Sequence, residues 1–90
     1  MPTVRFVVRG LVQGVGFRWF VMREALQLDL RGWVSNLADG SVEIVASGSD
    51  DAISTIEAAL ARGPRGAIVS RVEKTLSSHQ IEEDKSFHIK

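Results

Sequence analysis

The sequence predicts an α+β domain, built as a two-layer sandwich in which an antiparallel sheet carries two helices on one face. Segments of helical periodicity alternate with segments of strand periodicity in the order βαββαβ, and a short apolar segment follows near the end. The chain has 90 residues, which is enough for one small domain with a single core. We therefore expect residues 1–90 to fold as one domain.

The composition excludes several classes of function. Lys and Arg number 11 and Asp and Glu number 11, so the formal net charge is zero and no overall field attracts nucleic acid or an anionic membrane. Cysteine is absent, which excludes disulfides, a thiol nucleophile and thiolate zinc sites. The sequence has no secretory signal, and no apolar run approaches the roughly 18 residues of a membrane span. We expect a cytoplasmic protein with no nucleic-acid or membrane partner.

The first half of the chain contains a strand, a helix and the start of a hairpin. Residues 3–9 alternate between apolar and polar faces, as a half-buried strand does, and a glycine turn ends this strand. From Trp19 to about Leu28, apolar residues recur at helical spacing and predict the first helix. Gly32 is expected to stop the preceding segment. Residues 33–37 then indicate a second strand, which leads into Asp39-Gly40, a strong hairpin signal.

The next segment contains the third strand and the second helix. Residues 41–46 alternate until Ser47-Gly48-Ser49 breaks the pattern. Ser49 or Asp50 can cap a helix that residues 63–66 close. Its apolar stripe consists of Ile53, Ile56 and Leu60, with Ala52 and Ala59 beside it.

The end of the chain predicts two further strands. Residues 68–77 are β-branched and alternating, with Val72 and Leu76 on one face and Val69 on the other. Residues 87–89 place two apolar side chains two positions apart, as in a short extra C-terminal strand that packs on the sheet. The complete order is typical of the ferredoxin-like folds, with the split βαβ pattern.

The stretch Gln13-Gly14-Val15-Gly16-Phe17-Arg18 lies between the first strand and the first helix. Backbone N–H groups of such a turn, the unsatisfied N–H groups of a helix start and a guanidinium together form an anion site. The charge of Arg18 opposes the helix dipole, and a bound anion would compensate this misfit. The dinucleotide fingerprint fails because Trp19 replaces its last glycine, and the triphosphate loop lacks its Lys-Ser or Lys-Thr. On shape alone, a tight connection without function is the alternative.

Other polar residues give weaker signals. Asn36 is an amide in an otherwise apolar strand, where asparagine is disfavoured, and turn chemistry for the hairpin is the alternative explanation. His79 and His88 are both expected to be solvated, and the acidic run at residues 82–84 is expected to be a solvated turn. No Ser-His-Asp grouping and no metal-ligand spacing can be assembled, so no metal site is predicted.

Two longer motifs carry a resemblance. Residues 12–18, Val-Gln-Gly-Val-Gly-Phe-Arg, are followed by Gly32-Trp33-Val34-Ser35-Asn36 and by Asp39-Gly40-Ser41-Val42-Glu43. With these motifs the chain resembles the acylphosphatase family over almost its whole length. The resemblance implies a monomeric enzyme that hydrolyses the carboxyl-phosphate bond of an acyl phosphate, a small-molecule substrate, and releases a carboxylate and inorganic phosphate without metal or organic cofactor.

The resemblance also implies roles for single residues. Arg18 matches the family's phosphate-binding arginine, and Asn36 matches its water-orienting asparagine. The segment from Gln13 to Phe17 matches the loop whose backbone amides wrap the phosphate, and the family's mechanism is substrate-assisted. One departure is Asp29, which stands where the family commonly has glycine at a helix end, and it bears on stability rather than on catalysis.

Two alternatives to this enzyme share its fold. One is a non-catalytic ferredoxin-like module that binds RNA or a phosphorylated ligand. RNA-binding modules of this fold place several aromatic side chains on central strands, whereas here Phe6 is the only aromatic residue in the first strand and the third strand has none. The other is an acylphosphatase-like module of a larger carbamoyl-transfer maturation protein. It would require further domains, and none is expected because the sequence ends at Lys90.

Overall fold

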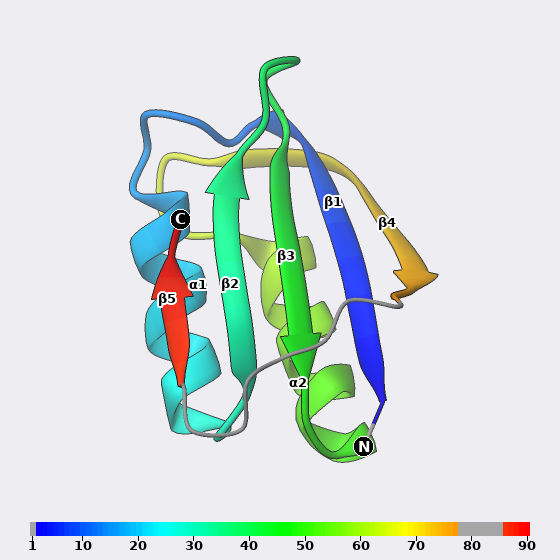
Figure 1. Ribbon diagram of the computed structural model, residues 1–90. Helices are drawn as coiled ribbons and strands as arrows, with labels where there is room; N and C mark the ends of the chain where they lie inside the picture. The colour runs from blue at the N-terminus through cyan, green and yellow to red at the C-terminus, as the bar shows by residue number, and fades with distance from the viewer. Residues whose placement is uncertain (1, 78–85) are drawn as a thin grey trace.

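The computed structural model describes residues 2–77 and 86–90, so His79 and the acidic run at residues 82–84 lie outside the described residues. Two helices cover one face of a five-stranded sheet, which confirms the predicted α+β sandwich (Figure 1). The elements are β1 (Thr3–Leu11), α1 (Phe17–Gln27), β2 (Arg31–Asn36), β3 (Val42–Ser47), α2 (Asp50–Arg62), β4 (Ile68–Leu76) and β5 (Phe87–Ile89).

The order of the strands across the sheet is β4-β1-β3-β2-β5. The four long strands pair antiparallel, as predicted, whereas β5 pairs parallel with β2 and makes the sheet mixed. Because β1 and β2 both run antiparallel to β3, their carboxyl ends lie at the same edge of the sheet. The parallel pairing brings the end of β5 to this edge as well, where α1 begins (Figure 1).

The core lies between the sheet and the two helices, and it follows the predicted alternation. The inward face of β1 consists of Val4, Phe6 and Val8, all at most 2% exposed. The predicted stripe of α2 is also buried, with Ile53, Ile56 and Leu60 in one cluster with the sheet residues. The helices cover one face of the sheet, and the edge where β1 and β2 end carries the loop before α1, the hairpin between β2 and β3, and the C-terminus (Figure 1).

Gly32 does not stop a segment, as the sequence suggested, but lies inside β2. Its φ angle is +137°, and a Cβ atom added there would lie 1.8 Å from the Val45 carbonyl oxygen of β3. A glycine is needed because the backbones of the two strands approach too closely for any side chain. The sequence does not separate these two cases, because glycine is common both at strand ends and where two strands approach closely.

The strand β4 contains a β-bulge that the sequence did not predict. Arg9 of β1 pairs with Arg71, but Gly10 pairs with Val69, so Ser70 has no residue opposite it. The extra residue reverses the alternation, because one unpaired residue turns the following side chains to the other face. The prediction that Val69 and Val72 lie on opposite faces is therefore wrong, and both pack against the core.

The end of β1 differs from its predicted position, and the end of β4 is more exposed than its apolar sequence suggests. β1 continues through Gly10 to Leu11, so the turn before α1 begins at Val12 and not at Gly10. Leu76 shares the face of Val72, as predicted, because the two pair with Val4 and Val8 on one face of β1, but at the end of β4 Leu76 is 85% exposed. β4 is an edge strand, and its last residues have a paired strand on one side only.

The end of α1 forms a Schellman motif around Asp29. The Leu30 N–H donates to the Ala25 carbonyl at 2.9 Å, and the Asp29 N–H donates to the Leu26 carbonyl at 3.3 Å. Asp29 has a φ angle of +55°, the left-handed conformation that glycine adopts most readily at this position. Its carboxylate also lies at the negative end of the helix dipole. Both effects oppose folding.

Asp29→Gly is therefore expected to stabilise the protein by about 0.5–1 kcal/mol, because left-handed backbone is costly for residues with a Cβ atom. This corresponds to an increase in Tm of about 4 °C for a domain of this size. Urea and thermal unfolding of both proteins measure the difference. Asp29→Asn separates the two causes, since it removes the charge and keeps the Cβ atom. A glycine variant no more stable than the original would contradict the strain at this position.

Candidate active site

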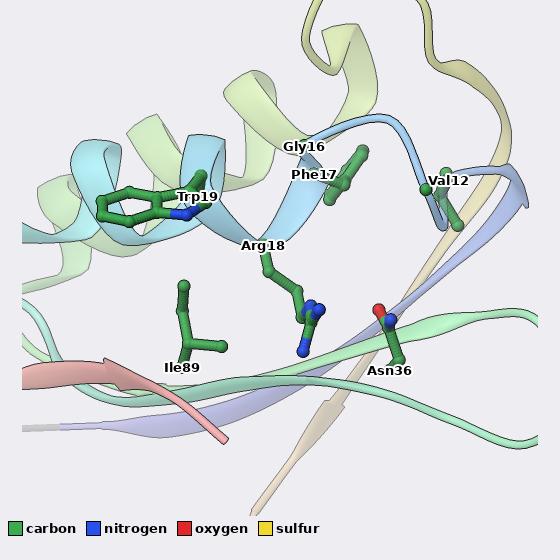
Figure 2. Close-up of a pocket in the computed structure, with 8 residues that line it drawn as sticks. Val12, Gly16, Phe17, Arg18, Trp19, Asn36 and Ile89 are labelled. Atoms are coloured by element: carbon green, nitrogen blue, oxygen red, sulfur yellow. The ribbon is translucent and has the colours of Figure 1, made fainter.

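A pocket of about 240 Å³ opens at the edge of the sheet where α1 begins and where β2 and β5 end (Figure 2). The loop between β1 and α1, residues 12–16, is called the glycine loop below. The pocket is lined by residues of this loop, of the first turn of α1 and of the two strand ends: Val12, Gly14, Gly16, Phe17, Arg18, Trp19, Asn36 and Ile89. Both residues that the resemblance marks as catalytic lie in this one pocket. The order of the strands brings them together, although they are distant in sequence.

Arg18 is the second residue of α1, and its side chain extends from the helix toward the sheet, into the pocket (Figure 2). The residue is half-buried, and its guanidinium forms no ion pair or side-chain hydrogen bond with any of the residues at 2–77 or 86–90. Other arginines have carboxylate partners: Arg5, Arg9, Arg62 and Arg71. The donors of Arg18 are therefore available to an anionic ligand in the pocket.

The amino end of α1 has no side-chain cap. Its N-cap residue is Gly16, with left-handed φ and ψ angles of 78° and 19°, and no side chain caps the helix or places a carboxylate in its first turn. The start of α2 is different, because the Ser49 hydroxyl accepts from the Ala52 N–H and two aspartates stand in the first turn. Of the two predicted caps, Ser49 and Asp50, the structure has Ser49. At α1, the N–H groups of the first turn remain for a ligand.

Asn36 is the last residue of β2 and pairs with Val42 of β3 at the base of the hairpin. Its side chain is exposed and points into the same pocket, on the sheet side, beside the guanidinium of Arg18 (Figure 2). A primary amide can both donate and accept hydrogen bonds. The pocket therefore combines a cation and uncapped N–H groups with one neutral amide that approaches from the opposite layer.

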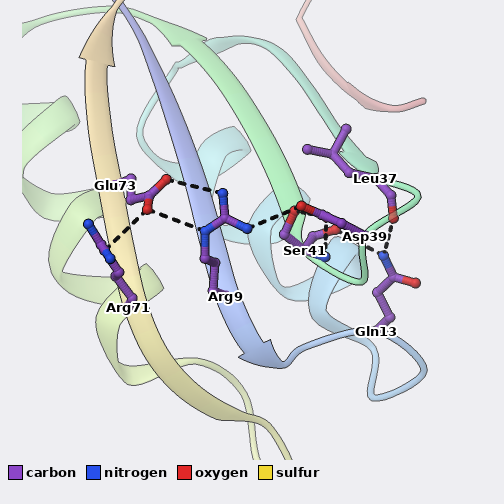
Figure 3. Close-up of polar contacts among 7 residues, drawn as sticks. All are labelled: Arg9, Gln13, Leu37, Asp39, Ser41, Arg71 and Glu73. Atoms are coloured by element: carbon purple, nitrogen blue, oxygen red, sulfur yellow. Dashed lines mark hydrogen bonds and ion pairs between the residues drawn. The ribbon is translucent and has the colours of Figure 1, made fainter.

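Gln13 and Val15 are in the predicted loop but are not among the residues that line the pocket. The side-chain amide of Gln13 donates to the carbonyl oxygens of Leu37 and Ser41, at 2.8 and 2.9 Å (Figure 3). Val15 packs against the core. Gln13 thus joins the glycine loop to the hairpin neck next to Asn36, while the contribution of backbone amides from Gln13 and Val15 stays a prediction.

The hairpin is held to the sheet by a charged network centred on Arg9 (Figure 3). Arg9 pairs with Asp39 in the hairpin at 3.1 Å and with Glu73 of β4 at 3.3 Å. The hydroxyl of Ser41, together with its backbone N–H and Arg9, lowers the pKa of the Asp39 carboxyl from 3.8 to about 2. The Arg9 guanidinium also lowers the pKa of Glu73, by a hydrogen bond. The hairpin after Asn36 therefore contacts β1 through Asp39 and the loop before α1 through Gln13.

The lowered pKa of Asp39 predicts a pH dependence of stability. Because the pKa in the folded state lies below the unfolded value, the ionised carboxylate stabilises the folded protein. The contribution is complete above the unfolded value of 3.8 and is lost as the pH falls through about 2. Asp39→Asn should therefore lower the free energy of unfolding near neutral pH. Urea titrations at several pH values should show this difference vanishing at the acid end, and a constant difference would contradict the assignment.

Three lining residues were not predicted as part of a site: Val12, Trp19 and Ile89. The sequence indicates Trp19 only as the start of a helix, and Ile89 only as a side chain packing on the sheet. Ile89 reaches the pocket because β5 runs parallel to β2, a pairing with no local sequence signal. The predicted solvation of His88 is confirmed, since its side chain is exposed. Its ring also lies near that of Trp33, with ring centres 6.5 Å apart.

The residues that the structure describes contain neither a cluster of metal ligands nor a membrane-spanning helix. In these ranges, no group of three or more His, Cys, Asp or Glu side chains gathers as a metal site would require. No helix between residues 2 and 77 is both long and apolar enough to span a bilayer.

Comparisons with known proteins show the family and the fold. A family model described as acylphosphatase matches residues 4–89. An acylphosphatase of Nitratidesulfovibrio vulgaris is 51% identical over 74 residues, which cover 82% of this chain and 74% of that protein. The crystal structure of acylphosphatase from Bacillus subtilis has a TM-score of 0.91 and 40% identity, over 99% of this chain and 98% of that one. HypF from T. kodakarensis has a TM-score of 0.86 and 38% identity, over 100% of this chain and 12% of that one.

Proposed function

The chain belongs to the acylphosphatase family and is an acylphosphatase, and from this premise we propose how its residues hydrolyse an acyl phosphate. The pocket at the start of α1 binds the phosphoryl group, and one water molecule attacks its phosphorus. The bond between phosphorus and the carboxyl oxygen breaks, and the products are a carboxylate and inorganic phosphate. A monomeric state and a cytoplasmic location stay predictions.

The chemistry needs positioning more than it needs reactive groups. An acyl phosphate is a mixed anhydride, and its carboxylate is a good leaving group, so no covalent intermediate with the protein is required. Holding the phosphoryl group and one water in line supplies much of the rate enhancement, because it removes the entropy cost of bringing them together. The water proton passes to a phosphoryl oxygen of the substrate, which makes the reaction substrate-assisted.

Arg18 and the start of α1 hold the phosphoryl group. The planar guanidinium donates to two phosphoryl oxygens, while N–H groups of the loop and of the first turn donate to the third. These donors meet the charge that spreads over the equatorial oxygens in a loose transition state. The absence of competing carboxylate partners among the described residues supports this role, since Arg18 does not have to break an ion pair first.

Asn36 positions the attacking water. Its amide lines the pocket beside Arg18 and can hold a water by one donated and one accepted hydrogen bond. An amide does not take up a proton at neutral pH, so Asn36 orients the water and does not act as a base. Gln13 supports this position, because its side chain bonds Leu37, the next residue in the hairpin.

The observation that carries the proposal is a half-buried arginine without a described partner, at an uncapped helix start, in one pocket with Asn36. The direct test is hydrolysis of benzoyl phosphate by the unaltered protein in the presence and absence of EDTA. We expect equal turnover in both. Lack of turnover with and without EDTA would favour the binding-module alternative, and turnover lost only with EDTA would contradict a metal-free mechanism.

The same roles predict a flat pH profile. Neither arginine nor asparagine side chains change charge near neutral pH, so kcat should vary little between about pH 5 and 8. A change in kcat/KM should follow the ionisation of the substrate alone. Initial rates measured across this range check the expectation. A transition at the pKa typical of histidine would implicate His88 or His79 as an acid or base.

A further inference from the structure

Trp19 and Ile89 line the pocket, but the mechanism above gives neither of them a role. Trp19 is 62% exposed, and it does not belong to the hydrophobic core, although its neighbours Phe17 and Phe20 both pack there. A large apolar side chain that faces a pocket and contributes nothing to the core is available for contact with a ligand.

Ile89 is held at the pocket by backbone pairing. It pairs with Val34 in the parallel register of β2 and β5, and the next N–H, from Lys90, donates to the Val34 carbonyl at 2.8 Å. Ile89 is half-buried and approaches the pocket from the sheet, whereas Trp19 approaches from the helix (Figure 2). Two apolar side chains therefore face one part of the pocket from opposite layers.

The in-line geometry of phosphoryl transfer determines which part of the substrate occupies the space between Trp19 and Ile89. The attacking water and the leaving oxygen lie on opposite sides of the phosphorus. In Figure 2, Asn36 lies on one side of the Arg18 guanidinium, and Trp19 and Ile89 lie on the other. With the water at Asn36, the acyl group leaves toward Trp19 and Ile89.

We propose, on the basis of the function proposed above, that Trp19 and Ile89 form an acyl subsite that selects apolar acyl groups, aromatic ones above all. The indole offers a flat face on which a planar ring stacks, and Ile89 covers the opposite side. Of the described residues that line the pocket, Arg18 is the charged one, and the phosphoryl group engages it. A second carboxylate on the acyl group would find no further cation there, so dicarboxylic acyl phosphates are poorer substrates.

Substrate pairs test the subsite. The ratio of kcat/KM for benzoyl phosphate to that for acetyl phosphate should fall about 5-fold in Trp19→Ala, the size expected for the loss of one aromatic contact. Ile89→Ala should lower the same ratio, and Trp19→Phe should retain most of it. Leu26→Ala is the matched control, because Leu26 is an apolar residue of α1 that is 45% exposed but lies outside the pocket lining. Its ratio should be unchanged.

Binding of stable analogues separates the subsite from the proposed function. Phenacylphosphonate and acetonylphosphonate replace the bridging oxygen by a methylene, so they bind without being hydrolysed. The original protein should bind the phenacyl compound more tightly, and Trp19→Ala should lose this preference. If the original protein prefers the phenacyl compound and Trp19→Ala loses this preference, while neither acyl phosphate is hydrolysed, the proposed function fails and the subsite stands. If both substrates are hydrolysed and Trp19→Ala changes neither preference, the subsite is overturned. Far-UV circular dichroism confirms that each variant is folded.

Discussion

Arg18→Lys is expected to lower kcat/KM for benzoyl phosphate by about 10²-fold or more, the loss typical of removing one group that stabilises transition-state charge. Lysine retains the positive charge, but its ammonium is a point charge and cannot donate to two phosphoryl oxygens in a fixed plane. The guanidinium of Arg18 lies in the pocket without an ion-pair partner among residues 2–77 and 86–90, so the substitution breaks no described contact within the protein. The loss should therefore appear in catalysis and not in stability.

A matched control is available on the same helix. Arg23 is exposed and lies outside the pocket lining, and Arg23→Lys should leave kcat/KM within about 2-fold of the original value, as for surface substitutions generally. Urea unfolding of both variants checks that neither substitution alters the fold. Hydrolysis by Arg18→Lys at a rate close to the original would remove Arg18 from the phosphoryl-binding role and with it the proposed mechanism.

Asn36→Ala is expected to lower kcat by about 10²-fold, the loss typical of removing one group that acts in the transition state, while the inhibition constant of inorganic phosphate stays nearly unchanged. An interaction made only with the attacking water contributes to the transition state and not to ground-state phosphate binding. Asn36 is exposed at the end of β2, so its truncation leaves no cavity in the core. Steady-state kinetics with benzoyl phosphate, together with inhibition by phosphate, separate the two quantities.

The opposite pattern would contradict this role. If Asn36→Ala weakens the binding of phosphate while kcat is retained, the amide contacts the phosphoryl group and another residue holds the water. Ser35→Ala is a useful comparison, because Ser35 precedes Asn36 on β2 and is not part of the pocket lining. It should alter neither kcat nor phosphate inhibition.

Local signals in the sequence were sufficient for most of the secondary structure. The alternation of β1, the apolar stripe of α2 and the Ser49 cap depend on neighbours a few residues away, and all three are confirmed. Gly32 and the bulge at Ser70 could not be predicted in this way. Each depends on how closely, or in which register, a strand distant in sequence approaches.

The site was predictable to the extent that its motifs are continuous. Arg18 and Asn36 were singled out by their unusual residue types, but only the strand order brings them into one pocket. Ile89 enters the pocket through the parallel pairing of β5, which no spacing in the sequence indicates. The side-chain hydrogen bonds of Gln13 were also beyond prediction, since their acceptors are backbone carbonyls of the hairpin.

The hydrogen bonds of Gln13 determine when the loop loses its freedom. They join positions 24 and 28 residues apart, so they form only when the hairpin and the loop have come together during folding. Part of the conformational entropy of the loop is then removed before any ligand arrives, and binding has less disorder left to remove. We therefore expect substrate association to be fast and without a slow conformational step.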